Sequence, residues 1–213
     1  METRNRKNAV VTGSSSGIGF ETALLLARSG FHTYATMRNL DKSQKIADMA
    51  KKENLPLEIL QLDVVDDNSV KDAFGRIVEE MKRIDVVVNN AGYVLMGAVE
   101  DLSIDEIKTQ FETNVFGTVR VIHSVIPVMR NQRSGTIVNV SSIEGRMAFP
   151  LNAAYVSTKF AIEGLSEGMR HEAREFGINV ITVAPGAVKT NFVNNAKVAQ
   201  KATSPNSAYA QMM

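Results

Sequence analysis

The sequence has no cysteine among its 213 residues, and it has only three histidines. The lack of cysteine excludes disulfides, thiolate zinc sites, iron–sulfur clusters and a cysteine nucleophile. The histidines, His32, His123 and His171, stand far apart and do not have the spacing of metal ligands. We therefore expect no metal site.

An excess of charge of either sign is also missing, because 24 Lys and Arg residues face 23 Asp and Glu residues. A net charge of +1 provides no field that would attract nucleic acid or anionic lipid. No run approaches the roughly 20 apolar residues of a membrane-spanning helix, and Met1–Val11 does not match a signal peptide. We expect a cytoplasmic protein with a small-molecule partner and without a nucleic-acid or membrane partner.

Apolar residues make up 44% of the chain, which is enough for one well-buried core. No repeat, low-complexity tract or linker divides the sequence. We expect a single domain over residues 1–213, in which the polar stretch 193–213 is a C-terminal segment without a strand pattern.

Short apolar runs alternate with longer helical patterns along the chain, which is typical of a parallel sheet covered by helices on both faces. Six such runs are mostly continuous, as in strands that are buried on both sides. They predict an α/β fold with a Rossmann-like, doubly wound parallel sheet in a three-layer α/β/α arrangement. The predicted strands are Ala9–Thr12, His32–Thr36, Leu57–Asp63, Asp85–Asn89, Thr136–Ser141 and Asn179–Ala184.

Helical patterns fill the intervals between these runs. The fourth begins at Ser103, whose spacing to Glu106 is that of a capping box, and Asp67 or Asn68 is a candidate cap for the third. The predicted helices are Ile18–Ser29, Leu40–Glu53, Ser69–Met81, about 104–131 and about 153–176.

A glycine-rich turn, Thr12–Gly19, follows the first predicted strand and leads directly into a helix. Its spacing is G-x-x-x-G-x-G. Glycines allow a tight turn and a close approach of backbone N–H groups to a pyrophosphate, and the helix N-terminus favours negative charge there. In this strand-turn-helix context, the turn predicts a dinucleotide site rather than a loop without a ligand.

The end of the second predicted strand reads Thr36-Met37-Arg38, and Met37 stands where an acidic residue would bind the ribose hydroxyls of NAD. Arg38 is suited to a 2′-phosphate through charge-assisted hydrogen bonds. The alternative is a solvated loop arginine. We expect NADP(H) to be favoured over NAD(H).

Tyr155 and Lys159 are four residues apart in a predicted helix, so their side chains share one face. An ammonium within about 4–6 Å favours a phenolate and should lower the tyrosine pKa from about 10. Tyr155 is then a candidate general acid or base. Ser142, after the fifth predicted strand, is a candidate hydrogen-bond donor to a substrate oxygen.

In this order, the glycine turn, Asn89-Asn90-Ala91-Gly92, Ser142 and Tyr155-x-x-x-Lys159 resemble the short-chain dehydrogenase/reductase family in its compact branch, over about residues 7–192. The run Tyr155–Ala161 and the turn 36–39 look most like hydroxysteroid and retinol dehydrogenases. The resemblance implies hydride transfer between a nicotinamide and an alcohol or carbonyl carbon of an apolar small molecule.

The resemblance also implies roles for individual residues. Tyr155 is the acid/base, Ser142 the donor to the substrate oxygen, Lys159 the activator of the tyrosine and a ligand of the nicotinamide ribose, and Asn114 the holder of a water in the proton relay. The cofactor-binding residues, besides Tyr155 and Lys159, are Gly13, Ser15, Ser16, Gly17, Ile18, Gly19, Arg38, Asp63, Val64, Asn90, Ala91, Gly92, Pro185, Gly186, Val188 and Thr190.

Relatives in this family form dimers through helices equivalent to about 104–131 and 153–176, and we expect such a dimer here. They usually have a seventh strand and a further helix, for which we find no pattern before Met213. This raises the possibility that the native chain continues. Phe192 and Val193 are expected to anchor a mobile lid, and Met96, Met147, Phe149 and Phe192 are candidates for lining an apolar pocket.

Two other readings are open. A binding or sensor protein would keep the NADP(H) site without turnover, but Ser142, Tyr155 and Lys159 are intact. An epimerase or dehydratase of the extended branch would share Tyr-x-x-x-Lys, but it would have a different glycine spacing and a larger C-terminal domain.

Overall fold

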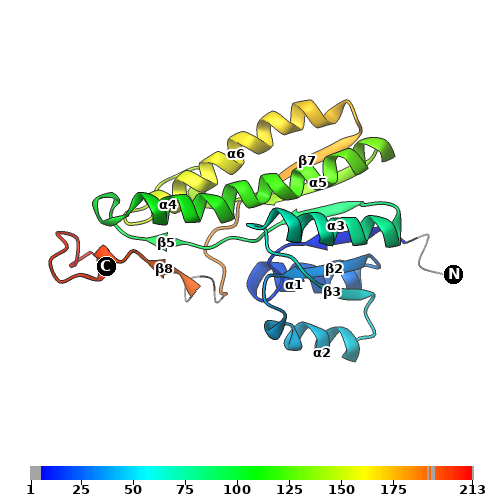
Figure 1. The fold of residues 1–213 in the computed structure, drawn as a ribbon, viewed down its shortest axis with the longest axis horizontal. Coiled ribbons are helices and arrows are strands. Elements are labelled where there is room, and N and C mark those ends of the chain that lie inside the picture. The colour runs from blue at the N-terminus through cyan, green and yellow to red at the C-terminus, as the bar shows by residue number, and fades with distance from the viewer. Residues whose placement is uncertain (1–5, 191, 193–194, 213) are drawn as a thin grey trace.

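A computed structural model describes residues 6–190, 192 and 195–212 of the chain. Its centre is a parallel sheet of six strands in the order β3-β2-β1-β4-β6-β7, which Figure 1 shows between helices. All six predicted strands are confirmed. Their bounds are β1 Asn8–Val11, β2 His32–Met37, β3 Leu57–Gln61, β4 Val86–Asn89, β6 Gly135–Val140 and β7 Ile178–Val183.

The strand order reverses between β1 and β4. The chain runs outward from β1 through β2 to β3, and then returns so that β4 pairs with the other side of β1. In such a sheet, ligands bind at the carboxyl ends of the strands, next to this reversal. The predicted Rossmann-like, doubly wound topology is therefore confirmed, and it indicates where the functional site lies.

Two groups of helices bury the two faces of the sheet. On one face, apolar residues of α3, α5 and α6 pack with Val10, Val87 and Ile137. On the other face, α1 and α2 pack with Val11, Ala35 and Val88. The bounds are α1 Gly17–Arg28, α2 Gln44–Lys52, α3 Asp67–Met81, α5 Gly117–Gln132 and α6 Ala153–Arg174.

The helix predicted over about 104–131 contains a change of geometry. It consists of α4 (Ile104–Phe111), a π-helical turn over Glu112–Phe116, and α5. The Ser103 capping box is confirmed. The cap of α3 is Asp66, which accepts N–H groups of Asn68 and Ser69, so the candidates Asp67 and Asn68 were wrong by one or two positions.

The helix predicted over Leu40–Glu53 is also divided. A short 3-10 turn, Leu40–Lys42, comes first, and α2 begins at Gln44. The Asn39 side chain accepts the N–H of Asp41 and so supports the separate turn. Side chains of this type compete with helical hydrogen bonds, which explains the interruption.

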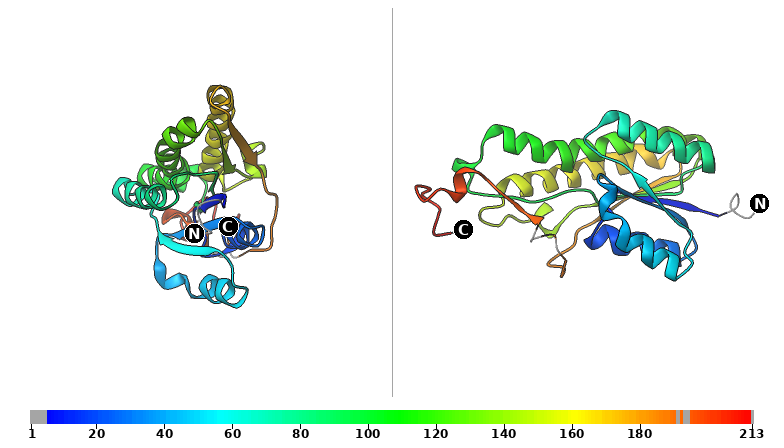
Figure 2. Two further views of the ribbon diagram at one scale, coloured as in Figure 1. Left: turned by 90° about the vertical axis from the view of Figure 1, so that its right-hand side faces the viewer. Right: turned by 60° about the horizontal axis from the view of Figure 1, so that its bottom comes forward.

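The C-terminal segment contains a strand that the sequence pattern did not predict. Lys197–Val198 (β8) pairs in parallel with Leu95–Met96 (β5), outside the main sheet. β7 is present as the outer strand of the main sheet beside β6, and among the described residues after it no further strand joins that sheet. Figures 1 and 2 show β5 and β8 beyond the end of the sheet that lies opposite the N-terminus.

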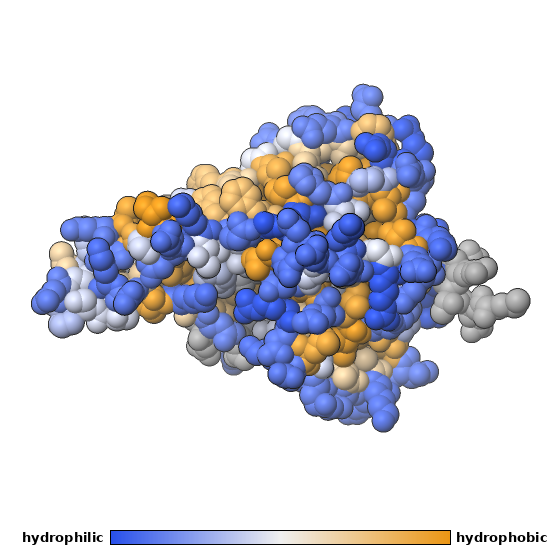
Figure 3. Space-filling model, viewed as in Figure 1, coloured by the Kyte–Doolittle hydropathy of each residue, from blue (hydrophilic) through white to orange (hydrophobic). Residues whose placement is uncertain are grey.

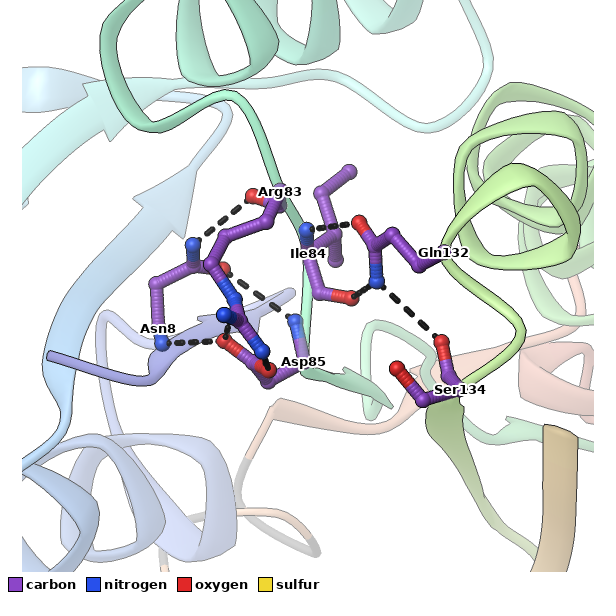
Figure 4. Close-up of polar contacts among 6 residues, drawn as sticks. All are labelled: Asn8, Arg83, Ile84, Asp85, Gln132 and Ser134. Carbon is purple, nitrogen blue, oxygen red and sulfur yellow. Dashed lines mark hydrogen bonds and ion pairs between the residues drawn. The ribbon is translucent and has the colours of Figure 1, made fainter. Parts of the chain in front are cut away.

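A polar network fastens β1 to β4 at the amino end of the sheet (Figure 4). The buried Asp85 accepts the backbone N–H of Asn8 at 2.8 Å and pairs with Arg83, while the Asn8 amide donates to the Arg83 carbonyl at 2.7 Å. Gln132 at the end of α5 bridges both backbone groups of Ile84. These bonds hold the register of the two central strands at the end away from the expected ligands.

Within the described residues, no helix has both the length and the apolar character that crossing a bilayer requires.

Candidate active site

The glycine turn lies at the carboxyl end of β1. Gly13 and Gly17 have φ values of +69° and +61°, in the left-handed region that glycine tolerates best. A Cβ on Gly19 would lie 2.5 Å from the Gly13 carbonyl oxygen, so a side chain there would not fit. The bare backbone at the N-terminus of α1 is the cradle that a pyrophosphate requires, and the turn therefore fits a dinucleotide.

The segment Asn90-Ala91-Gly92 is bound to this turn. The Thr12 hydroxyl accepts the backbone N–H groups of Asn90 and Ala91, both at 3.0 Å. The Asn90 amide donates to the carbonyls of Thr12 and Gly13 at 2.9 and 3.2 Å. These hydrogen bonds join the carboxyl ends of β1 and β4. The predicted cofactor-binding residues of the glycine turn and of Asn90–Gly92 therefore lie side by side.

Arg38 is exposed beyond the carboxyl end of β2, and the Ser14 N–H donates to the Thr36 carbonyl, which joins the glycine turn to the same strand end. Met37, in contrast, is 2% exposed and packs in the core with α1 and α2. At the end of β2, Met37 is thus the buried residue and Arg38 the exposed one.

Asp63 and Val64 follow β3 at the same edge of the sheet. The Asp63 carboxylate accepts the N–H of Val65 at 3.2 Å and is partly exposed. The Val64 side chain is buried against Gly117, where an added Cβ would come within 2.7 Å of it. Asp63 is therefore available to a ligand, and Val64 would contribute its backbone.

Ser142 begins a 3-10 turn, Ile143–Gly145, at the carboxyl end of β6. Its hydroxyl oxygen accepts the Glu144 N–H at 3.1 Å. The Ile143 N–H donates to the Pro185 carbonyl at 2.9 Å, which joins this turn to the segment after β7. Because the Ser142 oxygen already accepts a bond, its own hydrogen is free to be donated to a neighbour.

Tyr155 and Lys159 share the face of α6 that packs toward Ser142. They are 4% and 7% exposed, and the Lys159 Nζ lies 5.6 Å from the Tyr155 ring centroid. The Lys159 ammonium donates to the Val140 carbonyl at 2.7 Å. The predicted i, i+4 pair is confirmed as a buried pair beside the carboxyl end of β6.

Burial shifts the pKa values of both groups away from their charged forms. Burial raises the pKa of Tyr155 to about 12, although the Ser142 hydroxyl lowers it and the Glu144 carboxylate adds to the rise. Burial also lowers the pKa of Lys159 to about 8, against an opposing effect of the Glu163 carboxylate. The expected lowering of the Tyr155 pKa is therefore not found, because desolvation of the phenolate is the largest effect.

Asn114 lies in the π-helical turn between α4 and α5 and is 2% exposed. Its side chain bonds both backbone groups of Tyr93 and donates to the Thr158 hydroxyl at 3.1 Å. Single π-turns occur frequently at functional sites. Asn114 thus connects the segment after β4 to the residue that precedes Lys159.

The segment Pro185–Thr190 closes the site on the side of β7. The Thr190 side chain comes closest to Gly17, whose added Cβ would lie 3.6 Å from it, while Gly186 and Val188 are exposed. Phe192 stacks at a tilt on Tyr155 with ring centroids 6.0 Å apart. Val193, the other expected lid anchor, lies outside the described residues.

The remaining candidates for an apolar lining are available at the surface. Met147 and Phe149 are 47% and 44% exposed, and Phe192 is 37% exposed. Met96 lies in β5 and is partly exposed. Of these side chains, Phe192 is the one that contacts the Tyr155 ring, so it leaves apolar surface beside the candidate acid for a substrate.

Sequence reasoning missed two polar residues beside Tyr155, namely Glu144 and Asn152. The Asn152 amide donates to the Glu144 carboxylate at 3.4 Å, and burial raises the pKa of Glu144. The one signal in the sequence is the position of an acidic residue between Ser142 and Gly145, in a turn that borders the site.

A family model described as short chain dehydrogenase matches residues 7–201. An uncharacterized oxidoreductase of Bacillus subtilis is 42% identical over 189 residues, covering 88% of this chain and 67% of its own length. Human retinol dehydrogenase 8 is 39% identical over 191 residues, covering 87% of this chain and 60% of its own length. The chain thus spans about two thirds or less of these curated relatives.

Two solved structures have the same arrangement of elements. A short-chain dehydrogenase from Streptomyces avermitilis has a TM-score of 0.86 at 34% identity, over 97% of this chain and 74% of that one. ElxO with NADP bound has a TM-score of 0.83, also at 34% identity, over 89% of this chain and 77% of that one.

Proposed function

This chain belongs to the short-chain dehydrogenase family, whose members are NAD(P)-dependent oxidoreductases, and from that premise we propose that it reduces a carbonyl carbon of a largely apolar small molecule with NADPH or runs the reverse oxidation. The observation that carries the proposal is the buried pair Tyr155 and Lys159 beside Ser142. The glycine turn and the segment Asn90–Gly92 are assigned to the dinucleotide, which supplies or accepts the hydride when bound.

Tyr155 is the proton donor in the reductive direction. With a pKa of about 12, its phenol stays protonated at neutral pH and is ready to give a proton to the substrate oxygen as that oxygen gains negative charge. Ser142 donates its free hydrogen to the same oxygen and stabilises the developing charge. The oxidative direction needs the phenolate, so the protonated resting state favours reduction.

Lys159 has two tasks in this proposal. Below a pH of about 8 its ammonium carries a positive charge 5.6 Å from the Tyr155 ring centroid, which stabilises the phenolate as the proton leaves. It would also donate a hydrogen bond to the nicotinamide ribose, as the resemblance to the family implies. Asn114 positions the helix that carries both residues through its bond to Thr158.

NADP(H) is the proposed preference over NAD(H). Arg38 supports it as an exposed guanidinium one residue beyond β2, at the edge of the sheet that carries the glycine turn. The NADP-bound ElxO is one solved protein with this fold. Ser15, Ser16 and Ile18 would add backbone contacts from the turn, and Pro185–Thr190 would border the nicotinamide.

The decisive experiment is the oxidation of NADPH by a panel of ketones and aldehydes with native protein and with Tyr155→Phe. We expect the variant to lower kcat by about 10²–10⁴-fold, because a general acid is lost, and to leave NADPH affinity nearly unchanged. Tyr34→Phe is the control, since that hydroxyl bonds Glu80 on α3 instead. Undiminished turnover by Tyr155→Phe would overturn the proposal.

A homodimer through α4, α5 and α6 and a cytoplasmic location are further proposals. Phe160 on α6 and Phe116 in the π-helical turn before α5 are 48% and 50% exposed, and Figure 3 shows apolar side chains exposed over the region of α5 and α6. Sedimentation of the native protein and of Phe160→Glu would test the dimer. Cell fractionation would test the location. The alternative of a non-catalytic NADP(H)-binding protein gains no support from the relatives.

A further inference from the structure

Two polar side chains beside Tyr155 lack a complete set of hydrogen-bond partners. The Glu144 Oε2 and Asn152 Oδ1 atoms are both buried, and neither has a partner among the described residues. A buried polar atom left unpaired costs about 1–3 kcal/mol, and native proteins keep few of them. The position of this pair at the active site suggests that a bound molecule completes it.

The two unpaired atoms are both acceptors, and they are held together. The Asn152 amide nitrogen donates to Oε1 of Glu144 at 3.4 Å, which leaves Oδ1 of Asn152 and Oε2 of Glu144 as the two acceptors without a partner. Asn152 occupies the N-cap position of α6 but makes no side-chain cap bond. Asparagine at an N-cap usually does so. Its side chain therefore bonds Glu144 instead of a backbone N–H of the helix.

The charge of Glu144 indicates that the molecule that binds these two oxygen atoms is a cation. No lysine, arginine or histidine of the described residues forms an ion pair with Glu144, and the ammonium of Lys159 is bonded to the Val140 carbonyl. Partly buried carboxylates are normally paired with a cation. A cation with several N–H donors would satisfy both oxygen atoms at once, whereas a hydroxyl has only one hydrogen to donate.

Glu144 is close to the reacting group. Its backbone N–H bonds the Ser142 hydroxyl oxygen, and its charge contributes to the raised pKa of Tyr155. A cation bound at Glu144 would therefore lie near the carbonyl that Tyr155 protonates. It would also offset the effect of the carboxylate on the phenol.

We propose that Glu144 and Asn152 form a subsite for a primary ammonium group carried by the substrate close to its reacting carbonyl carbon. This inference rests on the proposed function and narrows its substrate class to amino ketones, or the corresponding amino alcohols, with an apolar remainder. The apolar remainder packs against Phe192, whose ring lies against Tyr155. Glu144 determines specificity, and Tyr155, Ser142 and Lys159 perform the chemistry.

A binding experiment tests the subsite without requiring turnover. Octylammonium chloride and octanol would each be titrated calorimetrically into the NADP⁺-saturated protein. We expect octylammonium to bind roughly tenfold or more tightly than octanol, and Glu144→Gln to abolish that difference. Glu167→Gln removes one charge from an exposed position on α6 and should leave it unchanged. Equal binding of the two probes by native protein, or unchanged binding by Glu144→Gln, would overturn the proposal.

Turnover then separates this inference from the proposed function. NADPH oxidation would be compared for hexyl methyl ketone and for hexyl aminomethyl ketone, in which an amino group replaces one hydrogen of the methyl group. We expect Glu144→Gln to lower kcat/KM for the amino ketone about tenfold or more relative to the plain ketone, because its effect on the Tyr155 pKa is shared by both substrates, with unchanged NADPH affinity as the check on folding. Asn152→Ala is a milder second variant with the same expected direction. An unchanged ratio of the two substrates in a variant that still depends on Tyr155 would reject the subsite and leave the reductase standing.

Discussion

Lys159 is placed where its charge opposes folding. Its pKa falls from 10.5 to about 8 in the folded protein because the ammonium is buried. Between those two values the unfolded chain binds more protons, so stability rises with pH over that window, and below pH 8 the folded protein carries the full penalty. A residue that performs chemistry thus lowers stability at neutral pH, as functional sites often do.

Lys159→Met should therefore stabilise the protein while it destroys activity. At pH 6–7 we expect Tm to rise by about 2–4 °C, which corresponds to about 1 kcal/mol in a chain of this size. The gain should shrink as the pH rises from 8 and be absent above about 10.5. Thermal unfolding followed by circular dichroism across this pH range is the measurement. A Tm that falls at pH 6 would mean that the bond to Val140 outweighs the burial of the charge.

In our proposal, Arg38 is the residue that makes the affinity for NADPH higher than that for NADH. Because Met37 is buried, the substitution that adds an acid belongs at position 38. Arg38→Asp should lower NADPH affinity by about 10–100-fold, since it removes a charge-assisted bond and repels the phosphate. NADH affinity should change little. Fluorescence titration of both cofactors measures the ratio, with Lys52→Asp at the exposed end of α2 as the charge-matched control. A native protein that binds NADH as tightly as NADPH would contradict the expectation.

Among the structural elements, the C-terminal segment differs most from what the sequence indicated. Its polar composition predicted little apolar burial, yet Ala199 and Ala202 are 0% and 4% exposed and pack with Leu95, Leu102 and Ala154. Glu106 accepts the Gln200 N–H, and Asp101 accepts the Ser207 hydroxyl. Small alanines give almost no hydrophobic signal in a sequence, and the partners of β8 lie about 100 residues earlier. Neither fact is visible to a local pattern.

Ala199→Leu should loosen this segment. Ala199 is 0% exposed within a packed cluster, so a leucine there would overfill the cluster and push β8 away from β5. We expect KM for an apolar carbonyl substrate to rise several-fold while NADPH affinity stays the same. Hydrogen exchange should report faster exchange at Lys197 and Ala199, whose N–H groups bond the Val94 and Met96 carbonyls.

Ala208→Leu, at an exposed position of the same segment, is the control for the added volume. If Ala199→Leu exchanged no faster than this control, the docked arrangement of β8 would be wrong.

At the scale of the whole molecule, the strands, the doubly wound arrangement of the sheet and the shared helix face of Tyr155 and Lys159 were predictable. Continuous apolar runs identify strands that are buried on both sides, and Tyr155 and Lys159 have helical spacing. The sign of the Tyr155 pKa shift was not predictable, because it depends on how completely α6 buries that side chain. The inward direction of Met37 and the contact between Glu144 and Asn152 also depend on packing between distant segments.

The network around Asp85 contributes to global stability without contributing to chemistry. Asp85→Ala leaves the buried Asn8 N–H unpaired and removes the partner of Arg83. We expect a loss of about 2–3 kcal/mol in the free energy of unfolding, with unchanged KM and cofactor affinity because the site is at the opposite end of the sheet. Urea denaturation measures the loss. Asp48→Ala on the exposed side of α2 is the control, and an equal effect of both variants would count against this role.

The strand order also determines when the partners of each strand become available while the chain is being synthesised. β1 emerges first, but its second neighbour β4 lies 77 positions later, as the Asn8–Asp85 bond records. At about 5–20 residues per second, one edge of β1 waits on the order of several seconds for its partner. The glycine turn waits equally long for Asn90 and Ala91, which complete it. A nascent chain shorter than this exposes an unpaired apolar strand and has no finished dinucleotide site, so this interval is when chaperones would be needed.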